Sequence, residues 1–282
     1  MTTWQTSRFA IDLGQPRVMA IVNVTPDSFA DGGLHADAAS AMAHCDALLR
    51  EGAHILDIGG ESTRPGARTP SAEEELQRVL PVLRHALTLG VPISVDTSQP
   101  LVMRAALDLG VDIVNDVRAL RRDGALDVLA AHASAGVCLT HMRGEPGTMQ
   151  ATPVYEDVLA EVAEFLRVRR AALMARGIAA DRIVVDPGIG FGKTVAHNLA
   201  LLRCQRQLLE IGAPLLVGWS RKSTLGALTG KGVQDRLALS VAAALLAVQR
   251  GARVVRVHDV AATVDALALW RAVEDNNKAE EE

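Results

Sequence analysis

The feature that most constrains the fold is a repeated alternation of short apolar, β-branched runs with longer stretches of helical spacing. Short apolar runs bounded by turn residues predict buried strands. The eight runs are 17–24, 54–58, 92–96, 111–115, 136–140, 182–186, 214–218 and 253–257. Strands that alternate with helices pair in parallel through right-handed crossovers. Eight such units predict an α/β protein, a single (β/α)8 TIM barrel over residues 1–273. A doubly wound open sheet is the alternative.

Several helix ends are marked in the sequence. Ser71, with Glu74 three residues on, has the spacing of a capping box, and Pro100 and Gly110 suit the first turn and the end of a helix. The predicted helices are 37–50, 71–90, 100–109, 124–133, 156–176, 197–207, a short one ending near 228, 234–250 and 261–273. Residues 274–282 are acidic and predict a disordered tail.

Composition excludes several classes of function. The net charge is −4, so no basic field points to nucleic acid or to an anionic membrane. The apolar stretch 237–248 is too short to span a bilayer, and the first residues lack the apolar core of a signal peptide. Three separated cysteines predict reduced thiols and a cytoplasmic location. We therefore expect small-molecule substrates.

The stretch 182–193 joins a strand to a glycine-rich turn. Asp186 ends the strand, Pro187 prevents further ladder pairing, and Gly188, Gly190 and Gly192 allow close approach of a ligand. The spacing matches neither a P-loop nor the dinucleotide fingerprint, which weakens the open-sheet alternative. A tight strand-to-helix turn without a ligand is the simplest other interpretation.

Polar residues end nearly every predicted strand. In a (β/α)8 barrel the site forms at the C-terminal ends of the strands. The residues there are Asn23, Asp57, Asp96, Asn115, Asp186, Lys222, Arg256 and His258. Any one carboxylate could merely cap a loop, but a stability role would not place polar residues at almost all ends of one face.

Three subsets of these residues suggest chemistry. Carboxylate and amide groups of Asp96, Asn115 and Asp186, with Lys222, suit the edge of a planar heterocycle. A second subset suits phosphate or pyrophosphate and consists of Thr63, Arg64, Arg256 and His258. Asn23, with Asp27 and Asp31 nearby, is an all-oxygen set that suits Mg²⁺ held partly by phosphate. No covalent nucleophile or transition-metal motif is evident, and His258 beside Arg256 favours an anion over proton shuttling.

Seven motifs in order closely resemble the dihydropteroate synthase family, over about residues 17–273. They are 23–29, 57–66, 94–97, 114–116, 186–193, 220–223 and 256–259. The departures are Ala30, where the family has Ser, and Ile189, where a second Phe is common.

The resemblance implies an enzyme, a transferase of folate biosynthesis. It would join 6-hydroxymethyl-7,8-dihydropterin pyrophosphate to 4-aminobenzoate, giving 7,8-dihydropteroate and pyrophosphate. It implies that Asn23 binds Mg²⁺ and that the chain forms a homodimer. Members of the family are the targets of sulfonamides. The residues implied for the pterin are Asp96, Asn115, Asp186 and Lys222, with Asp96 and Lys222 catalytic. Those for pyrophosphate are Thr63, Arg64, Arg256 and His258. Those for 4-aminobenzoate are Thr63, Pro65, Phe191, Lys222 and Ser223.

The implied mechanism is departure of pyrophosphate followed by attack of the aniline nitrogen on a pterin-conjugated cation that Asp96 stabilises. The loops 25–35 and 61–71 would exclude water. Two alternatives remain at this point. One is a methyltetrahydrofolate-binding barrel of the corrinoid methyltransferase kind, and the other is a catalytically silent pterin-binding homologue.

Overall fold

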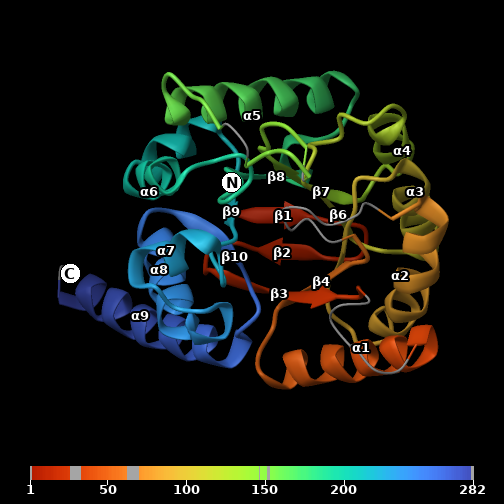
Figure 1. The fold of residues 1–282 in the computed structure, drawn as a ribbon, viewed down its shortest axis with the longest axis horizontal. Helices are drawn as coiled ribbons and strands as arrows, with labels where there is room; N and C mark the ends of the chain where they lie inside the picture. Colours follow the sequence, from red (N-terminus) through yellow and green to blue (C-terminus); the bar gives the residue numbers. More distant parts are fainter. Residues whose placement is uncertain (1, 26–32, 62–69, 146, 151–152, 281–282) are drawn as a thin grey trace.

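The predicted barrel is present in the computed structural model, which describes residues 2–25, 33–61, 70–145, 147–150 and 153–280. Eight parallel strands close in the order β10-β3-β4-β5-β6-β7-β8-β9, ringed by helices (Figure 1). The strands are β3 (Arg17–Asn23), β4 (Ile55–Gly59), β5 (Ile93–Asp96), β6 (Ile113–Asp116), β7 (Gly136–Thr140), β8 (Ile183–Asp186), β9 (Leu215–Val217) and β10 (Ala252–Val257). Each overlaps its predicted strand, and the ends differ by at most two residues.

The helices follow the strands as predicted, but several of their ends differ. They are α1 (Gly33–Arg50), α2 (Ala72–Ala86), α3 (Pro100–Leu109), α4 (Ala125–Ala131), α5 (Val158–Ala175), α6 (Val195–Arg203), α7 (Ser223–Thr229), α8 (Leu237–Gln249) and α9 (Val260–Glu280). The Ser71–Glu74 capping box is confirmed, and Gly110 ends α3 in the left-handed conformation. The predicted helix 197–207 is wrong at its end, because α6 ends at Arg203 and the chain continues as a 3-10 helix, η3 (Gln205–Ile211).

The end of the chain differs from the prediction. Helix α9 continues to Glu280, beyond the expected end at Val273, so the described part of the predicted tail, 274–280, is helical. Glu, Lys and Ala in this segment are good helix formers, which lets a docked helix extend into an acidic sequence. No helix in the described part of the chain is long and apolar enough to cross a membrane.

Side chains inside the barrel change from apolar to polar along its axis. Side chains alternate along a strand, so every second residue points inward. The apolar layer at the N-terminal end consists of Met19, Ile55, Ile113, Cys138, Val184, Leu216 and Val254. Two residues further along four of these strands are Asp57, Asn115, Asp186 and Arg256. The outward side chains form a larger core with the helices. The polar layer is therefore held between well-packed walls.

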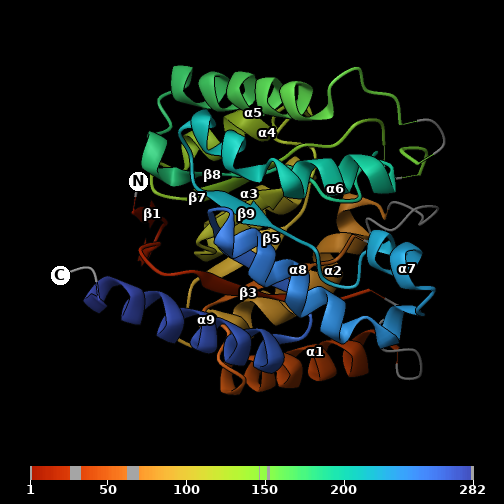
Figure 2. The ribbon, with the colours of Figure 1, turned by 90° about the vertical axis from the view of Figure 1, so that its left-hand side faces the viewer.

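A small antiparallel hairpin, which the sequence pattern did not predict, closes the N-terminal end of the barrel. It pairs β1 (Thr3–Gln5) with β2 (Ala10–Asp12). Trp4 is fully buried in the apolar layer, and its indole Nε1–H donates to the Arg182 carbonyl at 3.0 Å. Figure 2 shows β1 at one end of the molecule and α7 at the other. The barrel thus has a closed floor opposite the site.

Candidate active site

A cavity of about 690 Å³ opens at the C-terminal ends of the strands. Every residue of the described part of the chain that was predicted to bind a substrate or metal lines it. These residues are Asn23, Asp96, Asn115, Asp186, Phe191, Lys222, Ser223, Arg256 and His258. Thr63, Arg64 and Pro65, with Asp27 and Asp31, lie outside the described residues, so their predicted roles stay predictions. The barrel therefore brings together side chains from six strands and the loops that follow them.

A guanidinium and two carboxylates form the centre of the polar layer. Arg256 Nε donates to Asp57 Oδ2 at 2.5 Å, and Arg256 Nη2 donates to Asp96 Oδ2 at 2.6 Å. Asn115 Nδ2 donates to the same Asp57 oxygen at 3.0 Å, while Asp57 Oδ1 is buried and has no partner among the described residues. Arg256, which the sequence predicted to bind pyrophosphate, therefore lies beside Asp96, which was predicted to bind the pterin. Its inward direction follows from its spacing of two from Val254.

The charges of this centre are set by burial and by each other. Burial raises the pKa of Asp96 to about 7, against the opposing effect of Arg256, and Asp57 raises it further. Burial alone would lower the pKa of Arg256, but Asp57 and Asp96 outweigh it and raise that pKa. The guanidinium therefore stays charged, while the Asp96 carboxyl exchanges a proton near neutral pH.

Asp186 and the glycine turn form a second wall of the cavity. Asp186 Oδ1 accepts a hydrogen bond of 2.7 Å from the Gly188 N–H, so the carboxylate orders the turn that follows it. Burial raises the pKa of Asp186, opposed by this hydrogen bond and by Lys222. Gly190 N–H donates to Asn198 Oδ1 at 3.0 Å, which ties the turn to α6. Ile189, a departure from the family pattern, is buried and also lines the cavity.

Lys222 lies over the ring of Phe191. Its Nζ is 4.1 Å from the ring centroid, and burial lowers its pKa to about 8, with Asp186 opposing this effect. Gly190 is required beside it, because a Cβ there would lie 3.2 Å from Lys222 Cδ and φ is +83°. An ammonium, an aromatic ring and the Ser223 hydroxyl thus meet at one side of the mouth.

His258 is held neutral at the mouth of the cavity. Its Nδ1 is 2.9 Å from Ser220 Oγ, and its backbone N–H donates to the same oxygen at 3.1 Å. Burial lowers the pKa of His258 to about 3, and Arg256 and Arg221 lower it further. The Ser220 hydroxyl can donate its own proton to Nδ1 while it accepts the backbone N–H, and in that tautomer the Nε2–H is a hydrogen-bond donor.

Further residues line the cavity that sequence reasoning did not assign to the site. They are Ile21, Thr25, Glu61, Val117, Thr140, Met149, Gln150, Gly218, Ser220, Arg221, Val233, Gln234 and Arg236. Arg236 Nη1 donates to the Arg221 carbonyl at 3.0 Å, and Arg221 Nη2 binds Asp259 Oδ1 at 2.6 Å. Arg236 comes from a segment beyond α7, which no strand-end rule includes. Gln150 is a loop residue whose amide donates to the Gly190 carbonyl.

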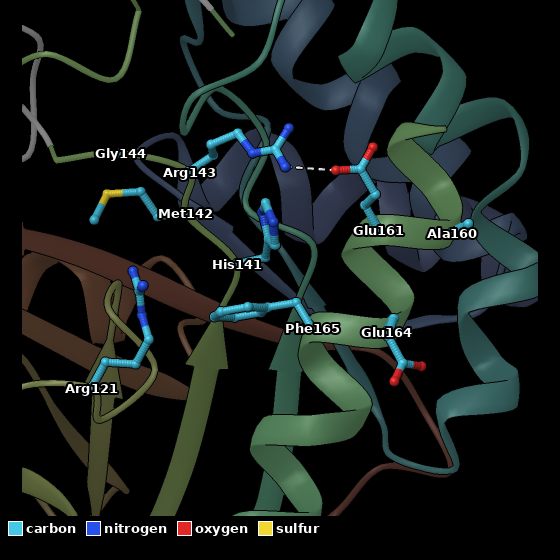
Figure 3. Close-up of a pocket in the computed structure, with 9 residues that line it drawn as sticks. All are labelled: Arg121, His141, Met142, Arg143, Gly144, Ala160, Glu161, Glu164 and Phe165. Atoms are coloured by element: carbon cyan, nitrogen blue, oxygen red, sulfur yellow. Dashed lines mark hydrogen bonds and ion pairs between the residues drawn. The ribbon is translucent and has the colours of Figure 1, made fainter. Parts of the chain in front are cut away.

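A second hollow lies between the segment that follows β7 and helix α5 (Figure 3). It is lined by Arg121, His141, Met142, Arg143, Gly144, Ala160, Glu161, Glu164 and Phe165. Arg143 Nη2 binds Glu161 Oε2 at 2.6 Å across it. The His141 ring packs edge-on against Phe165, with centroids 4.9 Å apart. His141 is therefore part of the wall between this hollow and the glycine turn.

A magnesium ion would fit this site only together with a phosphate-bearing ligand. In the described part of the chain no three His, Cys, Asp or Glu side chains are grouped to hold a metal. Asn23, at the end of β3, lines the cavity and carries one amide oxygen. Mg²⁺ commonly takes one or two protein oxygens and completes its shell with phosphate and water. The donor set is compatible with that arrangement.

Comparison with known proteins gives a consistent result. Residues 19–258 match the model of the family described as pterin binding enzyme. Dihydropteroate synthase of Neisseria meningitidis serogroup B is 55% identical, covering 96% of this chain and 97% of that protein. The Xanthomonas albilineans synthase solved with 4-aminobenzoic acid is 50% identical with a TM-score of 0.91, covering 97% of this chain and 98% of that one.

The synthase of Burkholderia cenocepacia, solved with 7,8-dihydropteroate, is also similar. It is 46% identical with a TM-score of 0.89, covering 99% of this chain and 98% of that chain. The similarity thus extends over nearly the whole of each chain. The chain belongs to the dihydropteroate synthase family of pterin-binding enzymes.

Proposed function

We propose that this chain joins 6-hydroxymethyl-7,8-dihydropterin pyrophosphate to 4-aminobenzoate and releases pyrophosphate. The observation that supports this most directly is the joint placement of the nine predicted residues around one cavity. Buried acids lie at its base, and Lys222 and Phe191 lie at its side. This arrangement provides acceptors for a flat heterocycle beneath a place for a second aromatic ring.

The pterin binds at the base of the cavity. Its N–H groups donate to Asp96 and Asp186, and Asn115 supplies both an acceptor and a donor for the ring edge. Lys222 donates to a ring acceptor from the side. Asp57 does not contact the pterin in this arrangement. It accepts hydrogen bonds from Asn115 and Arg256 and so holds both side chains in place. A buried acceptor left unpaired costs free energy, so these carboxylates discriminate against a ring that lacks the donors.

The pyrophosphate binds toward the mouth. His258 donates its Nε2–H, and Arg256, two residues before it in the chain, supplies a guanidinium. Thr63 and Arg64 are proposed to complete this set. Asn23 would hold Mg²⁺ together with the phosphate oxygens, and the ion would neutralise charge on the departing pyrophosphate. His258 binds as a neutral donor, so its contribution does not require a proton from solvent.

The 4-aminobenzoate binds between Phe191, Lys222 and Ser223, with Thr63 and Pro65 proposed on the opposite side. The ammonium of Lys222 lies over one face of the Phe191 ring. The rest of the ring surface is available to pack against the ring of 4-aminobenzoate. Ser223 begins α7 and offers a hydroxyl at the outer end of this region. The carboxylate of 4-aminobenzoate then lies on the cationic side of the mouth.

The reaction follows from this placement. The bond between the pterin methylene and the pyrophosphate oxygen breaks, and pyrophosphate leaves with the electron pair. The methylene cation is conjugated with the pterin ring, and the ionised Asp96 lowers its energy electrostatically. The aniline nitrogen attacks the methylene carbon, forms the new carbon–nitrogen bond and releases its proton to solvent water. No protein nucleophile takes part in this sequence of steps.

We also propose that the chain acts as a homodimer through α8. This helix, Leu237–Gln249, contains no charged residue on any side. Leu246 on its outer face is 40% exposed, Leu237 at its first position is 46% exposed, and Leu228 of α7 is 51% exposed. Figure 2 shows α8 crossing one side of the molecule between α6 and α9. A helix that is apolar all round needs a partner surface. A cytoplasmic location remains a prediction from the sequence.

The decisive experiment measures pyrophosphate release from the dihydropterin pyrophosphate, with and without 4-aminobenzoate and Mg²⁺. We expect release that depends on Mg²⁺ and is coupled one to one with dihydropteroate. Tight pterin binding without release would contradict the proposal and favour a silent homologue. The methyltetrahydrofolate-binding alternative predicts instead that pyrophosphate does not compete for the site, because that barrel has no use for His258 and Arg256 together.

A further inference from the structure

Lys193 is a buried cation at the end of the glycine turn, and the reaction described above does not use it. It is only 3% exposed, and in the described part of the chain it makes no ion pair with a carboxylate. Burial lowers the pKa of Lys193 to about 7, and the charge of Asp186 opposes this effect. Burial of an ammonium costs free energy, and an apolar side chain of the same length would avoid that cost. Stability alone therefore does not explain a lysine here.

The contacts of Lys193 are directed at main-chain atoms of the turn. Its Nζ donates to the Gly188 carbonyl at 2.9 Å and to the Phe191 carbonyl at 3.1 Å. It also lies 2.8 Å from Nδ1 of His141. Burial, and next Lys193 itself, lower the pKa of His141 to about 2, so Nδ1 is unprotonated and accepts. One lysine side chain thus joins both ends of the turn to the segment after β7.

The two segments joined by Lys193 are in direct backbone contact. A Cβ at Gly188 would collide with the His141 carbonyl, and one at Gly192 would collide with the Arg143 carbonyl. His141 is in turn fixed by its edge-on contact with Phe165 of α5, as Figure 3 shows. The position of the turn is therefore set from behind by a rigid wall, and Lys193 supplies the polar attachment to it.

The residue whose position depends most on this attachment is Phe191. Its carbonyl is held by Lys193, while its ring faces Lys222 inside the cavity. A cluster of Val117, Met142 and Met149 also contacts the ring, but two methionines adapt readily to a displaced neighbour. The backbone hydrogen bond is the more directional constraint on where the ring lies.

We propose that Lys193 is a positioning residue for 4-aminobenzoate, because it fixes the 188–192 turn and thereby the ring of Phe191. This inference rests on the proposed function of the same cavity. Asp186, on the strand before the turn, is anchored by the β7–β8 ladder, where the His141 N–H donates to the Asp186 carbonyl at 2.9 Å. Pterin binding is therefore expected to depend much less on Lys193.

The test is steady-state kinetics of Lys193→Met, which keeps the length of the side chain and removes its hydrogen-bond donors. We expect the KM for 4-aminobenzoate to rise about tenfold, while kcat and the KM for the dihydropterin pyrophosphate change by less than about threefold. Lys193→Gln restores an N–H donor and is expected to recover part of the loss. An equal rise in both KM values, or no rise in either, would overturn the proposal.

Arg182→Met is the matched control. Arg182 is also a buried cation that donates to main-chain carbonyls, those of Ala135 at 2.7 Å and His132 at 2.9 Å, but at the opposite end of the barrel. This variant is expected to lower Tm without changing either KM. If Lys193→Met does not fold, His141→Leu removes the acceptor instead and is expected to raise the same KM.

The proposed function is checked separately with the wild-type chain. Absence of dihydropteroate from the wild type would contradict the proposed function. In that case calorimetric titration of 4-aminobenzoate into the wild type and the Lys193→Met variant decides the inference by itself. Weaker binding to the variant supports the positioning role, and equal affinity overturns it.

Discussion

At the scale of single residues, the site is organised by a guanidinium that two carboxylates share. Arg256 keeps Asp57 and Asp96 close together in the polar layer of the barrel, where two unpaired carboxylates would repel each other. Asp57 Oδ1, which is fully buried beneath the cavity-lining residues, has no hydrogen-bond partner among the residues that the structure describes. A ligand with N–H donors is the natural complement to such a layer.

Replacement of the two proposed catalytic groups tests their roles directly. Asp96→Ala removes the charge that stabilises the methylene cation, and Lys222→Ala removes a donor to the pterin and the ammonium over Phe191. Each is expected to lower kcat at least about a hundredfold, the usual loss for an electrostatic contact to a transition state. Turnover assays measure this, and circular dichroism should show an unchanged fold. Retention of more than a tenth of the activity would contradict either role.

The pKa of Asp96 predicts how pterin binding depends on pH. The N–H groups of the ring donate to the ionised carboxylate, which forms as pH rises through about 7. Affinity for 6-hydroxymethylpterin, which has no titrating phosphate, is therefore expected to rise with pH through this range and to fall up to tenfold per unit below it. Calorimetric titration between pH 5.5 and 7.5 checks this, with roughly one proton released per pterin bound below pH 7. A flat profile would contradict the prediction.

Sequence reasoning identified the polar residues at the strand ends because their chemistry contrasts with the apolar strand bodies. The inward direction of Arg256 could also be predicted, because side chains alternate along a strand and Arg256 follows the apolar Val254 by two residues. Sequence reasoning could not identify the pairing of Arg256 with Asp57 and Asp96, because that depends on which strands meet across the barrel. Lys193 was equally inaccessible, since a lysine after a glycine turn looks like an exposed residue until the wall behind it is known.

At the scale of elements, the N-terminal hairpin could not be predicted from the hydrophobic pattern of the sequence. Strands of three residues are too short for a period of two to be visible, and only Trp4 and Ile11 mark the buried side. The predicted helices were correct in order because their spacing extends over several turns. Their ends were less certain, as the 3-10 segment after α6 and the extension of α9 demonstrate.

The hairpin is predicted to serve stability and not catalysis. Trp4→Ala leaves a cavity against the apolar layer and removes the donor to the Arg182 carbonyl, so we expect a loss of about 3–5 kcal/mol in the free energy of unfolding. Urea unfolding measures the loss. Trp4→Phe, which keeps most of the volume, is the control and should lose less than half as much. A changed KM in the folded Trp4→Ala enzyme would contradict the separation of floor and site.

At the scale of the whole molecule, the order of strands was predictable because eight strand–helix units in one chain leave few ways to close a parallel sheet. The contribution of α8 was not predictable in the same way. Its sequence is apolar on every side, which is equally typical of a helix buried within one chain. Only the closed barrel shows that one of its faces is left at the surface.

A single charge on that face should reveal the assembly. Leu246→Glu introduces a carboxylate on the outer face of α8, and we expect it to convert a dimer into a monomer in sedimentation velocity. Leu101→Glu is the control, because Leu101 of α3 is also exposed, by 46%, on another helix. A wild-type monomer, or a dimer that survives Leu246→Glu unchanged, would contradict an interface at α8.

The closed floor of the barrel has a consequence for the order of events. Trp4 and the apolar layer close one end of the barrel, so substrates and products enter and leave the cavity through the same opening. If the pterin binds at the base and 4-aminobenzoate beside Phe191, as proposed, we expect the pterin to arrive first and 4-aminobenzoate second. The enzyme is expected to follow a compulsory sequence, in which 4-aminobenzoate that settles too early shuts the pterin out.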